Sequence, residues 1–197
     1  MRKSRISFIN SALLQSALAC LALAPSAALQ AYASTPTTSA VLKQIAPMPR
    51  LAGQGHMRFL GLQIYDARLW VGPGFDPRSF GQTPFALELT YHRGFSASAI
   101  AKRSIQEIQR QRPLSPAQVE RWTAQLQQWL PDVQAGERLT GVHLPGQGMR
   151  LWHGEQDRGM LQDPELARYF FGIWLSPQTS EPQLRNALLV NLPPSTP

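Results

Sequence analysis

The chain has 197 residues, of which 43% are hydrophobic and 16% charged, and it contains 17 prolines and 14 glycines. This composition is too apolar for a disordered chain and fits one globular domain with many turns. Part of the formal net charge of +7 lies in an N-terminal segment that we expect to be removed, which lowers the charge to +4. So mild an excess disfavours a nucleic-acid partner.

Residues 1–33 have the three parts of an export signal. Basic residues occupy three of the first five positions, an uncharged run follows at 12–24, and Ala31-Tyr32-Ala33 offers small residues to a signal peptidase. The run is shorter than the roughly 20 residues of a membrane-spanning helix. We predict cleavage before Ser34, no transmembrane anchor after cleavage, and a periplasmic or secreted protein. Lipidation at Cys20, the single cysteine, is the weaker alternative, and without it the mature chain has no thiol chemistry.

The cleaved chain is predicted to start with a flexible lead-in at residues 34–45, followed by one domain at 46–192. Alternating apolar side chains predict one or two strands within residues 57–71 and a further strand at 85–91. Two more strands are predicted to form a hairpin whose turn is Pro145-Gly146-Gln147-Gly148.

Helices are predicted in two pairs. A narrow apolar stripe predicts a helix at residues 96–112, and a capping box at Ser115-Pro116-Ala117-Gln118 begins the second, which Pro131 ends. Asp163-Pro164 opens a third helix, and Ser180 with Gln183 repeats the capping signal before the last. The order of strands, two helices, strands and two helices predicts an α+β fold with helices grouped against an antiparallel sheet.

Two patterns that would indicate a cofactor, a dinucleotide-binding loop and a histidine metal site, are incomplete in this sequence. Gly53-Gln54-Gly55 lacks the third glycine and the following helix of a dinucleotide loop, so we interpret it as a glycine-rich turn where the backbone passes close to neighbouring structure. The histidines are predicted at edges or on the surface, with His143 and His153 on opposite sides of the sheet. We therefore predict no metal site and no cofactor.

One polar cluster leaves two interpretations open. Asp66 and Arg68 share a strand face, and Arg58 precedes them in a similar apolar setting. A guanidinium in an apolar cleft can hold a carboxylate or phenolate through two parallel donors, whereas the alternative is a solvated ion pair. Glu88 is expected at a rim or on the surface. The aromatic residues at helical spacing are expected to pack in the core rather than form a ligand box: Trp122, Trp129, Phe170, Phe171 and Trp174.

Several strings also suggest a family. In order along the chain they are Leu51-Ala52-Gly53-Gln54-Gly55, Ile64-Tyr65-Asp66-Ala67-Arg68-Leu69-Trp70-Val71, Tyr91-His92-Arg93, Pro131-Asp132-Val133 and Phe170-Phe171-Gly172-Ile173-Trp174-Leu175. With them the chain resembles the bacterial chalcone isomerase-like proteins over nearly all of the part after the signal. The resemblance implies an open-faced β-sandwich, in which a large antiparallel sheet is covered by a layer of helices that leaves a cleft for an apolar ligand.

The resemblance carries the enzymes' catalytic residues over only in part. In the plant enzymes an Arg, Tyr and Thr network stabilises an oxyanion. The arginine falls on Met57 or Arg58, the threonine on Tyr65, and the tyrosine near Phe95 or Ser96, neither of which is a phenol. Ser180 corresponds to a late hydroxyl, although its capping role also explains it.

Three hypotheses follow. The first is an exported, non-catalytic protein that holds a fatty acid or other amphipathic small molecule, with Arg58 and Tyr65 gripping the anion as the resemblance implies, and with Arg68 and Ser180 as further candidates. The second is an isomerase of the intramolecular lyase type acting on a phenolic or related substrate. The third is an envelope structural or interaction protein whose cleft is filled by its own side chains.

Overall fold

A six-stranded antiparallel sheet forms the centre of the protein. The structure, a computed structural model, describes residues 39–193, so the predicted signal and its cleavage site lie outside the described residues. The strands follow one another across the sheet in chain order, from β1 to β6. Their bounds are β1 Arg50–Phe59, β2 Leu62–Val71, β3 Phe85–Tyr91, β4 Arg138–Leu144, β5 Gly148–His153 and β6 Gln156–Leu161.

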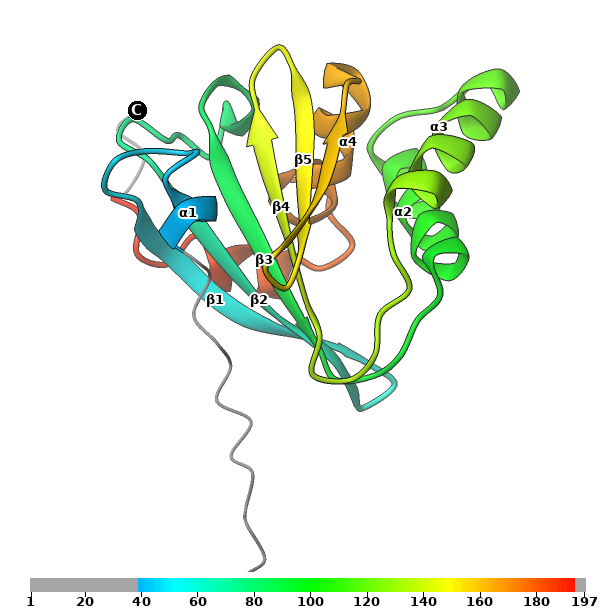
Figure 1. Ribbon diagram of the computed structural model, residues 1–197, viewed down its shortest axis with the longest axis horizontal. Helices are drawn as coiled ribbons and strands as arrows, with labels where there is room; N and C mark the ends of the chain where they lie inside the picture. The colour runs from blue at the N-terminus through cyan, green and yellow to red at the C-terminus, as the bar shows by residue number, and fades with distance from the viewer. Residues whose placement is uncertain (1–38, 194–197) are drawn as a thin grey trace, which may run out of the picture. The chain divides into compact units, whose positions relative to one another are not determined.

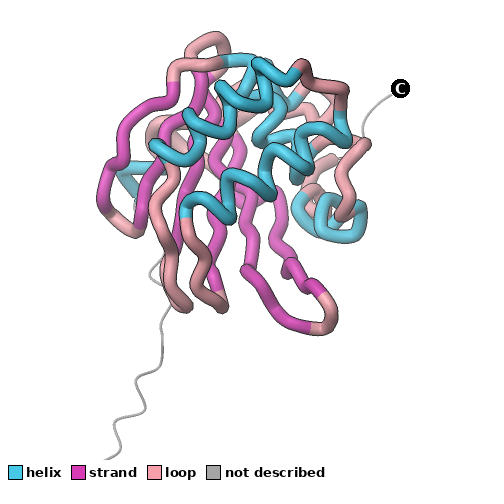
Figure 2. Tube along the Cα trace, turned by 90° about the vertical axis from the view of Figure 1, so that its right-hand side faces the viewer, coloured by secondary structure: helices cyan, strands magenta, loops and turns pink. Residues whose placement is uncertain are grey.

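Helices cover one face of this sheet, which confirms the predicted α+β fold. Helices α2 and α3 connect β3 to β4, and Figure 2 looks onto this helical layer with the strands behind it. We call the face toward α2, α3 and α4 the inner face and the opposite face the outer face. The helices are α1 Ser39–Leu42, α2 Ala97–Gln111, α3 Pro116–Trp129, α4 Pro164–Leu175 and α5 Pro182–Leu188. Within residues 39–193 none of them is both long and apolar enough to cross a bilayer.

Three helices begin where the sequence predicts, and the fourth does not. Ser96, Ser115 and Asp163 each accept a hydrogen bond from a backbone N–H in the first turn of α2, α3 and α4. The predicted cap at Ser180 is wrong, because α5 begins one residue later, with Glu181 at the N-cap position and no side-chain cap bond. The Ser180 hydroxyl is therefore free for another role.

The core lies between the inner face and the helices. On β2 and β3 the side chains that alternate inward are buried, among them Leu69, Leu87 and Leu89. The facing helices contribute Ile105, Ile108, Trp122, Leu126, Leu166, Phe170, Phe171, Trp174 and Leu175 to the same cluster. The apolar stripes of the helices thus pack against the buried side chains that alternate along the strands.

The outer face is covered in part by the segment expected to be a flexible lead-in. Val41 and Ile45 are buried there against Ala86 and Val142, and Figure 1 shows α1 across the sheet from α2 and α3. The structure thus differs from the expectation for residues 39–45. These side chains pack because the outer face is itself apolar at this end of the sheet.

The glycines of β1 mark a close contact, as predicted, but within a strand rather than a turn. A Cβ placed on Gly53 would lie 2.2 Å from the Ala187 carbonyl oxygen, and one on Gly55 would lie 2.8 Å from a Leu184 methyl carbon. Only glycine lets α5 approach the β1 backbone this closely. The interpretation of Gly53 and Gly55 as a site of close backbone approach is confirmed.

The β4–β5 hairpin corrects the histidine positions. His143 pairs with Met149, and His153 with Leu139, so both histidines lie on the same face of the sheet. His143 is buried and its Nε2 donates to the Gly81 carbonyl oxygen at 3.1 Å. The expectation of opposite faces, with His143 at an edge or on the surface, is wrong. It supposed a turn centred between Gly146 and Gln147, whereas Leu144 pairs with Gly148 and leaves three residues in the turn. Within residues 39–193 no cluster of His, Cys, Asp or Glu is suited to a metal ion.

Candidate ligand pocket

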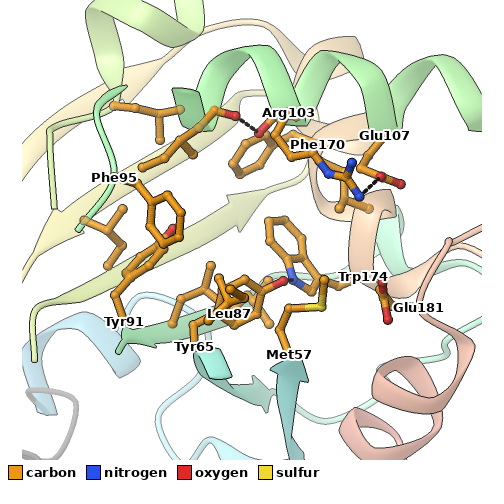
Figure 3. Close-up of a pocket in the computed structure, with 18 of the residues that line it drawn as sticks. Met57, Tyr65, Leu87, Tyr91, Phe95, Arg103, Glu107, Phe170, Trp174 and Glu181 are labelled. Carbon is orange, nitrogen blue, oxygen red and sulfur yellow. Dashed lines mark hydrogen bonds and ion pairs between the residues drawn. The ribbon is translucent and has the colours of Figure 1, made fainter. Parts of the chain in front are cut away.

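A pocket of about 360 Å³ lies between the inner face of the sheet and helices α2 and α4 (Figure 3). Small-molecule sites in proteins usually measure about 300–1,000 Å³, so this volume suits a small ligand. Five strands and two helices supply the apolar walls, which include Met57, Phe59, Leu87, Leu89, Tyr91, Phe95, Ile100, Leu139, Leu151, Phe170, Phe171, Ile173 and Trp174.

The aromatic residues of α4 serve both the core and the pocket. Phe170 makes edge contacts with Phe171 and Trp174 at centroid distances of 5.7 and 5.6 Å, and all three rings are buried. All three also line the cavity. The prediction that they pack in the core is confirmed, but α4 presents the same rings to the pocket.

Tyr65 lies in the wall of the pocket, as predicted. Its hydroxyl oxygen accepts a hydrogen bond from Trp174 Nε1 at 3.0 Å, and its ring meets Tyr91 edge-on at 5.8 Å. Burial raises the pKa of Tyr65 above its ordinary value, although the Trp174 bond acts in the opposite direction. The group is therefore a neutral phenol at physiological pH, and its O–H is left to donate to a ligand.

A charged cluster from α2 forms the polar end of the pocket. Arg103 Nη2 contacts Glu107 Oε1 at 2.7 Å, and Glu107 Oε2 accepts a hydrogen bond from the Ser180 hydroxyl at 2.8 Å. Glu107 is 5% exposed, and Arg110 Nε lies 3.4 Å from it on the solvent side. Ser180, a predicted ligand candidate, thus lines the pocket and is bonded to a carboxylate that the sequence did not single out.

Glu181 is the second carboxylate at this end. Among the described residues none donates a hydrogen bond to its side chain, while it lines the cavity together with Arg103 and Glu107. Figure 3 shows these three side chains toward one end of the pocket and Tyr91 and Phe95 toward the other. Burial, followed by repulsion from Glu107, raises the pKa of Glu181 despite the attraction of Arg103. The pocket therefore offers an unpaired acceptor there.

The structure overturns two of the predicted ligand contacts. Arg58 is exposed, and its neighbours Met57 and Phe59 line the pocket instead. Arg68 lies on the outer face, because alternation along β2 turns it away from the side on which Tyr65 lies. A register irregularity between Met57 and Arg58 is of the kind that simple alternation does not reveal.

Arg68 belongs instead to an ion cluster on the outer face. It contacts Glu88 Oε1 at 3.5 Å, and Arg138 Nε lies 3.7 Å from Glu88 Oε2. Glu88 is only 1% exposed, so its expected place at a rim or on the surface is wrong. Asp66 is bonded to His56 and His92 rather than to Arg68. Arg68 therefore does form an ion pair, but the expected solvated pair with Asp66 is wrong, because its partner is the buried Glu88.

The family model described as chalcone isomerase-like matches residues 59–190. The chain belongs to the chalcone isomerase-like family. No curated protein matches the sequence significantly.

Among solved structures, this chalcone isomerase-like chain is similar to the crystal structure of a fatty-acid binding protein of Arabidopsis thaliana. The TM-score is 0.55 and the identity 13%, over 75% of this chain and 89% of the plant chain. At this identity the likeness establishes the shared fold.

The positions that the resemblance assigns to the enzymes' tyrosine carry no phenol, although Tyr65 and Tyr91 line the pocket elsewhere. At the positions that resemblance assigns to the tyrosine, Phe95 has no hydroxyl and the Ser96 hydroxyl caps α2 by accepting from Ala99 N–H at 3.2 Å. Tyr65 stands at the position of the threonine and already accepts from Trp174. At these two positions the chain therefore differs from the tyrosine and the threonine that the resemblance implies.

Proposed function

We propose that this chalcone isomerase-like protein binds an amphipathic small molecule, a fatty acid or a related lipid, without converting it. The observation that carries the proposal is a largely apolar cavity of about 360 Å³ with a charged cluster at one end. Apolar walls take a hydrocarbon tail, and convergent polar groups fix a head group. A cavity left open by the protein's own rings also argues against a purely structural role.

The polar end favours one kind of head group. Arg103 is already paired with Glu107, while the Glu181 carboxylate has no hydrogen-bond donor among the described residues. The three charges that line the pocket sum to one negative charge. A head group that donates hydrogen bonds, such as an alcohol or an amine, therefore fits this end better than a carboxylate, which would be repelled by Glu107 and Glu181.

Three probes with one tail and different heads test both statements. Laurate, 1-dodecanol and dodecylamine are titrated at neutral pH, with binding followed by calorimetry and by the fluorescence of the pocket's Trp174. We expect binding, with the amine and the alcohol tighter than laurate. The net charge is positive, +7 for the full chain and +4 after the proposed cleavage, and would produce the opposite order, so non-specific attraction cannot mimic this result. Tightest binding by laurate would overturn the head-group preference alone.

A pair of matched variants shows whether the probes enter the pocket. Ile100→Trp fills the cavity from α2, whereas Val119→Trp places the same bulk at a partly buried position of α3 that does not line it. Only Ile100→Trp should abolish binding. No binding of any probe by the wild-type protein, or equal binding by Ile100→Trp, would refute the function. A chalcone ring-closure assay should stay at the rate of buffer.

We also propose that the protein is exported and works in the periplasm or outside the cell, after cleavage before Ser34. The basic start, apolar run and small residues of the N-terminal segment support this proposal. Mass spectrometry of the protein from a periplasmic extract should give a chain that begins at Ser34. A full-length chain confined to the cytoplasm would contradict it.

A further inference from the structure

The turn between β1 and β2 exposes a group of apolar side chains. Phe59, Leu60 and Leu62 are 55%, 85% and 52% exposed, and they surround Gly61 at the tip of the hairpin. Single exposed apolar residues are common on protein surfaces, but three in four consecutive positions form a patch. Figure 1 places this tip at the lower end of the sheet, beside the loops that join β3 to α2 and α3 to β4.

The backbone of the tip shows that leucine is an unfavourable choice there. Leu60 has φ of 50° and Gly61 has φ of 79°, and Leu60 is the only non-glycine residue with positive φ in the described part of the chain. Two-residue hairpin turns with positive φ at both positions favour Asn-Gly, because asparagine tolerates the left-handed region and leucine does not. Since Leu60 is exposed, packing within the fold does not offset this cost.

The tip is continuous with the ligand pocket. Phe59 is exposed at the tip and also lines the cavity, together with Met57 two residues before it. The exposed apolar patch therefore leads into the apolar wall of the pocket. A molecule with a hydrocarbon tail could pass from the tip to the cavity along a continuous apolar surface.

Basic residues lie near this patch. Arg58 precedes Phe59 and is exposed. Arg93, also exposed, follows His92, whose backbone N–H donates to the Ile64 carbonyl at the start of β2. Apolar side chains flanked by arginine are the pattern of proteins that lie on anionic lipid surfaces.

We propose that residues 59–62 insert into the surface of a lipid bilayer, with Arg58 and Arg93 at the level of its phosphates. Three side chains are too few for a stable protein interface, which buries about 800 Å² on each partner. A bilayer, in contrast, accepts single apolar side chains one by one. The inference goes beyond ligand binding, because it assigns a membrane contact to the hairpin tip, of which only Phe59 also lines the pocket.

Flotation with vesicles of phosphatidylethanolamine and phosphatidylglycerol tests the proposal on the purified protein. Wild-type protein should float with the vesicles, and Leu60→Asn should weaken binding about tenfold, the expected loss for one inserted leucine. The same change suits the turn, so thermal stability should stay equal or rise. The matched control is Val190→Asn, which alters an apolar residue that is 69% exposed elsewhere and should leave vesicle binding unchanged.

Several outcomes would overturn the proposal. The first is that Leu60→Asn binds vesicles as well as wild type does, and the second is that Leu60→Asn and Val190→Asn lose binding equally. The third is that wild-type protein does not bind vesicles but forms dimers that Leu60→Asn converts to monomers. Binding that does not weaken when phosphatidylcholine replaces phosphatidylglycerol would overturn the part assigned to the arginines. Laurate and dodecylamine affinities should be unchanged in Leu60→Asn, so failure here and failure of the pocket's function are distinguishable.

Discussion

The two faces of the sheet are buried in different ways. On the inner face Leu87 and Leu89 pack against helices, with a cavity left open between the layers. Between these two residues, on the outer face, Glu88 is just as buried but is held by Arg68 and Arg138. Burial of a carboxylate therefore does not by itself mark a functional site. Glu88 has charged partners on its own sheet, whereas the less buried Glu181 has an unpaired carboxylate facing a cavity.

The largest expected effect comes from breaking the outer-face cluster. Glu88→Ala leaves Arg138, itself only 8% exposed, as an unpaired buried charge. Loss of one partner of such a pair costs about 3–5 kcal/mol, and we expect a decrease of this size in the free energy of unfolding measured with urea. Ligand affinity should change little in the protein that remains folded, because Glu88 faces away from the pocket.

The control for this variant is Arg68→Ala. Its side chain is 35% exposed and lies 3.5 Å from Glu88, so water replaces much of the lost contact and the cost should be well below that of Glu88→Ala. Equal losses in the two variants would show that the cluster is not organised around Glu88 and Arg138, and the contrast between the two faces would fail.

A smaller effect is expected from the inner face. Tyr65→Phe removes the acceptor of the Trp174 indole N–H and leaves that donor unsatisfied in an apolar wall. Leaving a buried donor unpaired costs about 1–3 kcal/mol, again measurable as a loss in unfolding free energy. Since the pocket also loses the Tyr65 hydroxyl, the affinity for dodecanol should fall with it. The control is Tyr169→Phe, because Tyr169 does not line the pocket and its loss should leave dodecanol binding unchanged.

The features that the sequence predicted correctly are those that depend on neighbouring residues alone. Strand alternation in residues 85–91 and the capping box at Ser115 depend on local physics, and both were found where predicted. The α+β layout followed from the order of these elements. Alternation along a strand states which residues share a face, but the ligand candidates Tyr65 and Arg68 lie on opposite faces of β2.

The polar end of the pocket could not be predicted in this way. Glu107 falls outside the apolar stripe of α2, and its partner Ser180 is 73 residues away in sequence. A charge buried by a distant segment leaves no local signal, since helical periodicity reports only the side facing the core. The prediction that Arg58 contacts the ligand was wrong for a different reason. A shift of one residue in strand register decides which side chain enters the cleft. A carboxylate next to the apolar stripe, such as Glu107, was the one available hint.

The smallest expected effect is the pH dependence of the unfolding free energy. It distinguishes a carboxylate whose pKa is set by burial, Glu88, from one whose pKa is set by hydrogen bonds, Asp66. Burial raises the pKa of Glu88, although Arg138 and Arg68 oppose the shift. For Asp66 burial acts in the same direction, but hydrogen bonds from His56, His92 and Gln63 outweigh it and lower its pKa. A raised pKa in the folded state means that the unfolded state loses its proton first as pH rises.

The contribution of Glu88 is therefore fully present below the ordinary glutamate pKa of about 4.3 and declines as pH rises through the folded value. That of Asp66 is present above about 3.9 and is lost as pH falls through its lowered value. The free energy of unfolding in urea is measured between about pH 2.5 and 7 for wild type, Glu88→Gln and Asp66→Asn. For each variant its difference from wild type is plotted against pH. The two differences should slope in opposite directions, since desolvation dominates at one carboxylate and hydrogen bonds at the other. Slopes of the same sign would mean that the arginines around Glu88 outweigh its burial, and the outer face would then hold an ordinary stabilising ion pair.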